Sequence, residues 1–243
     1  TLLTGGAMTN ASAPEGPHIY HIGDYYYLLI AEGGTSHYHS STIFRSRSLT
    51  GPYEGNPRNP LITHRNLRWD YPVHSTGHAD MIQLANGEWW AVLLASRPVG
   101  GDYRTLGRET FCVPVRWEDD WPVFCPDTGR GEMCYQAPDL SAHPWPERPV
   151  CCQFESDRLG AEWVTVRTPR RKFYSLTERA GYLRLYPGPE TLRETSHSAF
   201  LGRRQQHMQY AVRTVLEWDP QEQEESGVVL LMNHRFHFRF VYG

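Results

Sequence analysis

The sequence predicts an all-β protein in which propeller-type blades are followed by part of a β-sandwich. Three observations support this prediction. Aromatic residues make up 13% of the chain, and 21 Gly and 18 Pro are spread through its 243 residues. Aromatic side chains favour strands, while Gly and Pro favour tight turns, so many short antiparallel strands are expected. In addition, one hairpin pattern occurs twice, and the periodicity of an amphipathic helix is hard to find.

The repeated pattern is a short strand, a glycine turn and an aromatic-rich strand. It spans residues 17–30 and again residues 79–94. Gly23 and Gly87 stand at the two turns, where a two-residue hairpin needs a positive φ angle. The offset of about 64 residues fits one blade of four antiparallel strands with long loops.

Further strands are predicted at 41–46 and 109–116, which would extend each hairpin into a blade. Two blades cannot close a ring, so a propeller requires more blades upstream. The chain opens on Thr1 and stops at Gly243 inside an alternating strand pattern. We therefore expect both ends to continue, and we leave the localisation open, with an extracellular protein as one alternative.

The composition changes after the second blade. We predict blades over residues 1–124, a linker rich in Pro and Gly over residues 125–149, and a second β region over residues 150–243. The alternating patterns of this last region resemble half of a sandwich. Its predicted strands lie near residues 150–154, 182–185, 210–217, 227–232 and 234–241.

Charge and cysteine content exclude several classes of function. A net charge of -3 and a pI near 6.4 offer no basic surface for nucleic acid or an anionic membrane. No apolar run approaches the roughly 18 residues of a membrane span. The odd count of five cysteines does not indicate a disulfide scaffold, and no Cys-x-x-Cys pair lies near a second one, as a zinc site would need. Cys125 and Cys134 could pair in an oxidising compartment, although free thiols are the simpler interpretation.

Three polar residues stand where a catalytic site could form. Glu15 lies in a rigid Pro- and Gly-rich loop that could hold a carboxyl at a pocket floor, where burial favours a general acid; a solvated turn glutamate is the alternative. His78 follows Gly77 at a predicted strand start and could orient a carboxylate or hold a cation, or simply be a core histidine. Arg108 could bind a carboxylate or sugar hydroxyls, or form a surface ion pair with Glu109.

Together these residues form a recognisable series of motifs. The sequence reads Glu-Gly-Pro-His at 15–18, Ala-Glu-Gly-Gly-Thr at 31–35, Gly-Pro-Tyr-Glu at 51–54, Thr-Gly-His-Ala-Asp at 76–80 and Leu-Gly-Arg-Glu-Thr at 106–110. In this order the series resembles glycoside hydrolase family 43, whose β-xylosidases and α-L-arabinofuranosidases are five-bladed β-propellers. The region from Cys151 onward resembles the concanavalin-A-like sandwich that follows the propeller in β-xylosidase-type members.

The resemblance implies roles for four residues. Glu15 matches the general acid that protonates the departing glycosidic oxygen, Arg108 matches an arginine that contacts substrate, and His78 matches a histidine near the propeller axis. By the same resemblance, Thr35 is expected to line the pocket. No organic cofactor is implied, and a calcium ion near His78 is left as an alternative. The family's general base and a second, acid-tuning aspartate belong to motifs that precede the matched region.

The implied parent is an inverting hydrolase that releases β-D-xylosyl or α-L-arabinofuranosyl units from xylan-derived saccharides. A xylo-oligosaccharide or an arabinose-substituted saccharide is therefore the expected partner, and the oligomeric state is left open. Without its base, the chain alone is expected to be inactive. Two alternatives remain: a non-catalytic carbohydrate-binding module, and a family 43 enzyme that acts on arabinan or galactan.

Overall fold

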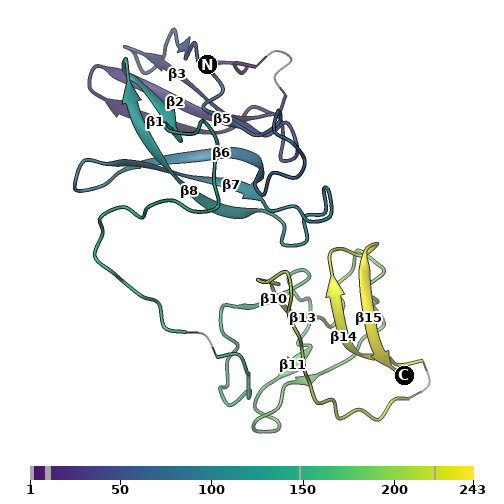
Figure 1. The fold of residues 1–243 in the computed structure, drawn as a ribbon. Helices are drawn as coiled ribbons and strands as arrows, with labels where there is room; N and C mark the ends of the chain where they lie inside the picture. The colour runs from purple at the N-terminus through teal and green to yellow at the C-terminus, as the bar shows by residue number, and fades with distance from the viewer. Residues whose placement is uncertain (1–2, 9–11, 148, 222) are drawn as a thin grey trace. The chain divides into compact units, whose positions relative to one another are not determined.

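The structure is a computed structural model that describes residues 3–8, 12–147, 149–221 and 223–243. The chain divides into two compact units, Thr1–His143 and Pro144–Gly243. Every regular element among the described residues is a β-strand (Figure 1), which confirms the all-β prediction. None of the described residues belongs to a helix that could cross a membrane.

The first sheet of unit 1 corresponds to the first predicted blade. Its strands are β1 (Glu15–Ile22), β2 (Tyr25–Glu32), β3 (Ser40–Ser46), β4 (Glu54–Gly55) and β5 (Ile62–Thr63). The strands β1 to β4 follow one another in chain order, and β5 also pairs with β3. The glycine turn at Gly23 joins β1 to β2, because glycine adopts its φ of 58° without steric cost.

The second sheet repeats this up-and-down order. It consists of β6 (His74–Gln83), β7 (Trp89–Ser96), β8 (Glu109–Glu118) and β9 (Trp121–Phe124). The predicted strands at 41–46 and 109–116 correspond to β3 and β8. Two successive up-and-down antiparallel sheets, of five and four strands, fit two blades of a propeller.

The core of unit 1 lies between these sheets, where β6 packs against β2 and β3. Because β2 is covered on both faces, all six of its residues from Tyr27 to Glu32 are buried. The Tyr27 hydroxyl donates a hydrogen bond of 2.7 Å to the Asp120 carbonyl, and its ring meets the edges of Trp117 and Trp121. Aromatic residues of the repeated pattern therefore serve mainly to pack the blades together.

The segment after β9 is held on unit 1 by a buried histidine. The Nε2 atom of His64 accepts a hydrogen bond of 2.9 Å from the Gly131 amide, so Nδ1 carries the proton that it donates to the Val73 carbonyl. Burial lowers the pKa of His64 to about 4, so the ring is neutral.

Burial also raises the pKa of the Cys125 thiol to about 11. All five cysteines are free thiols, including Cys125 and Cys134.

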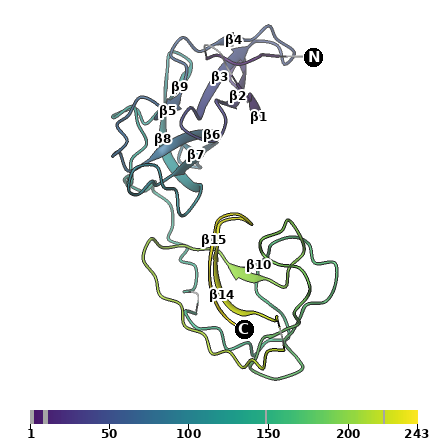
Figure 2. The same ribbon diagram turned by 90° about the vertical axis from the view of Figure 1, so that its right-hand side faces the viewer.

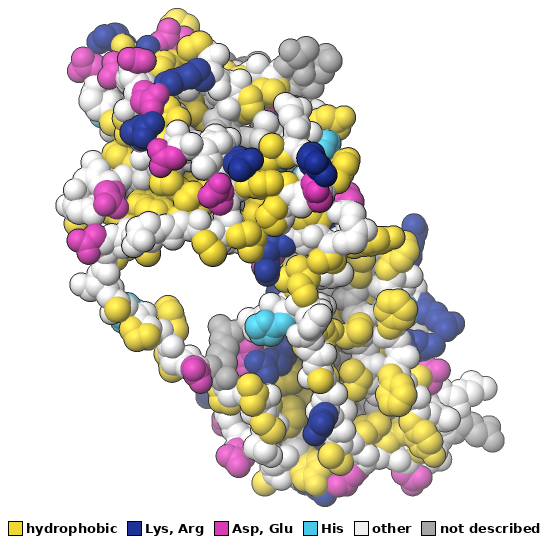
Figure 3. Space-filling view, viewed as in Figure 1, with side chains coloured by type: hydrophobic (Ala, Val, Ile, Leu, Met, Phe, Trp, Pro, Cys, Tyr) yellow, Lys and Arg dark blue, Asp and Glu magenta, His cyan; other side chains and the backbone are white. Residues whose placement is uncertain are grey.

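Unit 2 contains short antiparallel pairs, of which the hairpin of β14 and β15 is the longest (Figure 2). The paired strands are β10 (Trp163–Thr165) with β13 (Leu201–Arg203), β11 (Tyr174–Ser175) with β12 (Arg184–Leu185), and β14 (Ser226–Leu231) with β15 (His237–Tyr242). In β14 and β15, one face carries the exposed side chains Leu230, Phe238 and Phe240. Figure 3 shows hydrophobic side chains at the surface of both units.

The predicted strands near 227–232 and 234–241 match β14 and β15, but two other predictions for this unit are wrong. Residues 150–154 and 210–217 form no strand. Val215 is 90% exposed and Val150 is fully exposed, so these two side chains face solvent. A strand needs a partner for its backbone hydrogen bonds, and an alternating pattern alone does not supply one.

The neutral state of His64 predicts a pH dependence of stability. The unfolded chain binds a proton at His64 below a pKa of about 6.5, whereas the folded chain does so only below about 4. Stability from this residue is therefore present above pH 6.5 and is lost as the pH falls towards 4. We expect a loss of roughly 2–3 kcal/mol in the free energy of unfolding over this window, measured by urea denaturation. The variant His64→Gln should show a shallower slope, and an equal slope would contradict the assignment.

Candidate active site

The predicted site residues lie at corresponding ends of the two sheets. In the first sheet, Glu15 opens β1 and faces Ala31 near the end of β2. In the second sheet, Arg108 directly precedes β8, whose first residue pairs with Ala95 near the end of β7. In an antiparallel sheet the start of one strand lies beside the end of its neighbour. Glu15 and Arg108 therefore each lie at one end of their sheet.

A bulge in β1 sets the direction of Glu15. The register shifts between Glu15 and His18, and Gly16 lies in this shift with a φ of 58°. Bulges of this kind re-aim side chains and occur often beside active sites. The Glu15 side chain is 47% exposed, so it lies at a half-open surface instead of the pocket floor that the rigid loop suggested.

His78 reaches Glu15 from the second sheet. Its Nδ1 atom lies 3.7 Å from Glu15 Oε1. Although the sequence placed His78 at a strand start, it lies within β6 beside two register shifts, and it adopts a φ of 54°. A Cβ atom on Gly16 would lie 2.3 Å from His78 Nε2, so the glycine makes room for the imidazole. The structure thus brings Glu15 and His78 together across the junction of the two sheets.

A second histidine, which the sequence analysis missed, lies beside this pair. His39 is fully buried, and its ring centroid is 6.4 Å from that of His78. Burial lowers the pKa of His39, and a hydrogen bond of 2.8 Å between its Nδ1 and the Ser75 carbonyl partly offsets this shift. The charges of Arg108 and Glu15 also act on the His39 ring. In the sequence, His39 is marked only as a polar residue that stands just before a predicted strand.

Arg108 and Thr35 are less constrained. The anticipated ion pair between Arg108 and Glu109 does not form, because Glu109 is held by Arg97 through two hydrogen bonds of 2.9 and 2.8 Å. Among the described residues no ion pair involves the exposed Arg108 guanidinium, so its donors can bind another group. Thr35 is exposed in the loop between β2 and β3, and no hydrogen bond joins it to Glu15 or His78 among the described residues.

Three other carboxylates of unit 1 have structural partners. Asp80 lies within β6 and accepts a hydrogen bond from the Tyr20 hydroxyl, and Asp24 lies in the β1–β2 turn beside Arg47. Glu32 is buried and accepts hydrogen bonds from the Ala7 amide and the Thr42 hydroxyl. These partners hold the three side chains in place, so they serve the fold and leave Glu15 as the carboxyl at the junction.

The residues around His78 do not form a cation site by themselves. Among residues 3–8, 12–147, 149–221 and 223–243, no three His, Cys, Asp or Glu side chains are placed to hold a metal ion. Calcium takes 6–8 oxygen ligands, whereas the neighbours of His78 are one carboxylate and one imidazole. No step of the chemistry below uses a metal.

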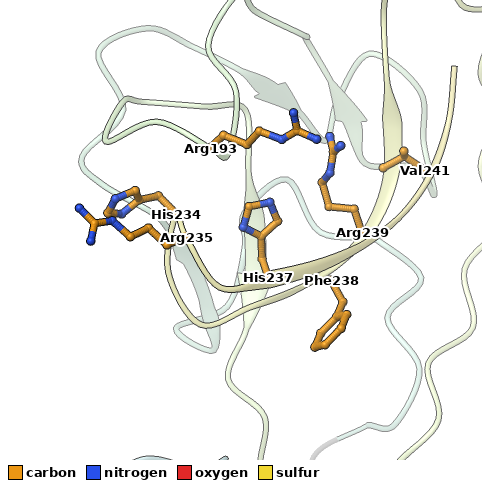
Figure 4. Close-up of a pocket in the computed structure, with 7 residues that line it drawn as sticks. All are labelled: Arg193, His234, Arg235, His237, Phe238, Arg239 and Val241. Carbon is orange, nitrogen blue, oxygen red and sulfur yellow. The ribbon is translucent and has the colours of Figure 1, made fainter.

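A separate pocket of about 690 Å³ lies in unit 2 (Figure 4). Its lining residues are Arg193, His234, Arg235, His237, Phe238, Arg239 and Val241. This lining is cationic and contains no carboxyl group, so it lacks both acid and base for glycoside hydrolysis. None of the predicted site residues belongs to it. The junction at Glu15 is therefore the candidate active site.

Comparison with protein families matches both parts of the chain. The family described as glycosyl hydrolases family 43 matches residues 1–122. The chain belongs to this family. Residues 151–243 match the β-xylosidase C-terminal concanavalin A-like domain, which confirms the prediction of a partial propeller followed by part of a sandwich.

Relatives and solved structures agree with this assignment. The chain is 43% identical to a non-reducing end α-L-arabinofuranosidase of Bacteroides ovatus, over 93% of this chain and 43% of the relative. It is 41% identical to a xylosidase/arabinosidase of Butyrivibrio fibrisolvens, over 97% of this chain and 46% of the relative. The solved structure "Bacteroides ovatus Xyloglucan PUL GH43B" matches with a TM-score of 0.85 and 40% identity, covering 97% of this chain and 47% of that one. The family 43 chain therefore spans less than half the length of these relatives.

The close approach of Gly16 to His78 predicts an effect of a single methyl group. Gly16→Ala and Gly23→Ala both place alanine at a φ of 58°, which costs about 1–2 kcal/mol in each case. Only at Gly16 does the new Cβ meet a neighbour, His78, whereas Gly23 has open space. We expect the ring signals of His78 in NMR spectra to shift in Gly16→Ala and to stay unchanged in Gly23→Ala. Unchanged signals in both variants would contradict the described junction.

Proposed function

We propose that this chain carries the acid half of the active site of an inverting glycosidase. The whole protein would remove β-D-xylosyl or α-L-arabinofuranosyl units from xylan-derived saccharides. The observation that supports this proposal most strongly is the position of Glu15, whose carboxyl faces His78 at 3.7 Å where two blades meet. Membership in family 43 and relatives named as β-xylosidase and α-L-arabinofuranosidase support the substrate class.

In the proposed reaction Glu15 donates a proton to the departing glycosidic oxygen. General-acid help of this kind matters most when the leaving group is a sugar alkoxide, which is too basic to depart unprotonated. His78 lies just beyond hydrogen-bond distance from Glu15 and can orient the carboxyl, since such contacts often tighten when substrate binds. Arg108 can donate from its exposed guanidinium to sugar hydroxyls.

The base of this reaction is proposed to come from outside these 243 residues. Inversion requires a carboxylate about 6.5–9.5 Å from the acid, on the opposite face of the sugar ring, to activate water. The Tyr20 hydroxyl donates to Asp80, and Arg47 donates to Asp24. The Thr42 hydroxyl donates to Glu32, so none of these three carboxylates is a suitable base. The chain alone is accordingly proposed to have no turnover.

A carbohydrate-binding module is the competing function. Such a module stacks exposed aromatic rings on sugar rings. Trp69 is 51% exposed, but His37 and His74 stack on it with centroid distances of 4.6 and 5.8 Å. Because these imidazoles contact the indole, the ring is a poor platform for a sugar. A binding module also has no use for an acid at Glu15, so Glu15→Gln would leave its sugar affinity unchanged.

A chimera tests the proposed role of Glu15. The segment that precedes the matched region in the Bacteroides ovatus α-L-arabinofuranosidase would be joined to the start of this chain. We expect the chimera to hydrolyse aryl β-D-xylosides or aryl α-L-arabinofuranosides and Glu15→Gln to lower kcat by about 10²–10⁴-fold. The loss should be largest for the most basic leaving group, because that group depends most on protonation.

The matched control is Glu88→Gln, which changes an exposed glutamate in the β6–β7 turn at the other end of the second sheet. It should keep the rate of the unmodified chimera, and the 243-residue chain alone should show no turnover. Equal rates for Glu15→Gln and Glu88→Gln in an active chimera would rule out Glu15 as the acid.

A further inference from the structure

The direction of His78 depends on an irregular stretch of β6. The register of β6 against β7 shifts between His74 and Gly77, and again between Gly77 and Asp80. Ser75 and His78, one in each shift, both adopt a φ of 54°. A side-chain-bearing residue in this conformation costs of order 1–3 kcal/mol and persists only where its surroundings hold it. Some neighbouring group must therefore stabilise the two bulges.

The start of β3 supplies that support at two points. His39, just before β3, forms the 2.8 Å hydrogen bond between Nδ1 and the Ser75 carbonyl. Ser41 accepts a hydrogen bond of 3.0 Å from the Ala79 amide through its Oγ atom. The two hydrogen bonds thus reach Ser75 and Ala79, which lie before and after His78 in β6. Both are buried, and a buried hydrogen bond left unmade costs about 1–3 kcal/mol.

The chemistry of the contact defines the state of the His39 ring. A carbonyl oxygen only accepts hydrogen bonds, so the proton must lie on Nδ1. Nε2 is then an unprotonated acceptor, and it is buried with no hydrogen-bond partner among the described residues. Gly77 permits this packing, since a Cβ there would lie 2.7 Å from His39 Cδ2. The ring therefore lies directly against the backbone that precedes His78.

We propose that His39 is a positioning residue of the candidate active site. Its Nδ1–H group holds the Ser75 carbonyl and thereby keeps the bulges of β6 in the conformation that turns His78 towards Glu15. That this hydrogen bond serves catalysis rests on the proposed function. The support itself is a property of the 243-residue chain and is measured without turnover, so the two proposals can fail separately.

The first test needs no substitution. Nitrogen-15 NMR of the histidine rings in the 243-residue chain distinguishes the two neutral tautomers. We expect His39 to be neutral with its proton on Nδ1 near pH 7. A neutral ring with its proton on Nε2 would overturn the proposal, because the Ser75 carbonyl would then lack its donor. A charged ring at this pH would also overturn it, because the buried Nε2–H group would then need an acceptor that the described residues do not supply.

The second test uses two substitutions that separate the donor from the bulk of the ring. In His39→Asn the side-chain amide can take the place of Nδ1–H, whereas His39→Leu fills the space without a donor. The Cα and Cβ chemical shifts of Ser75 and His78 report the positive φ angles. We expect both residues to keep these shifts in His39→Asn and to lose them in His39→Leu. If the leucine variant keeps them, or the asparagine variant loses them while folded, the proposal is wrong.

Discussion

The junction between the two blades depends on imidazole rings packed directly against glycine backbone. Gly16 in β1 leaves room for His78, and Gly77 in β6 leaves room for His39, with distances to an added Cβ of 2.3 and 2.7 Å. No other residue type could occupy either position without moving a ring. This close approach allows Glu15 from one sheet to face His78 from the next. The chemistry proposed for the chain follows from that approach.

The buried carboxylate of unit 1 is matched by hydrogen bonds. Glu32 has only 1% of its surface exposed, and its carboxylate accepts hydrogen bonds from an amide and from Thr42. A buried charge without such partners would lower the stability of the fold. Glu15 differs from Glu32 because it is half exposed and its neighbour is the imidazole of His78. The fold therefore separates a buried carboxylate that is held by hydrogen bonds from one that lies at an open surface.

The sequence predicted the blades better than the second unit. Strands β2 and β7 were found because their aromatic and apolar runs are bounded by Gly23 and Gly87, which is local information. The segments 150–154 and 210–217 carry similar apolar patterns, but strand formation there depends on partner strands, which a local pattern does not reveal.

The same distinction applies to the site. Glu15, His78 and Arg108 were proposed from short motifs and from their resemblance to a family. His39 was missed because its importance comes from a hydrogen bond to a carbonyl 36 residues away, at Ser75. The bulges of β6 were missed as well, since a regular strand and a bulged one have the same local pattern. Long-range contacts of this kind become visible only in the folded chain.

The central claim is that Glu15 acts as the acid of a single-displacement reaction, across the sugar from a water molecule. The most direct measurement is the anomeric configuration of the xylose first released from an aryl β-D-xyloside by the chimeric enzyme, followed by proton NMR before mutarotation. Inversion predicts that α-xylose appears first. If β-xylose appeared first, the reaction would need a carboxylate nucleophile only about 5–5.5 Å from Glu15, and the account of the site would be wrong.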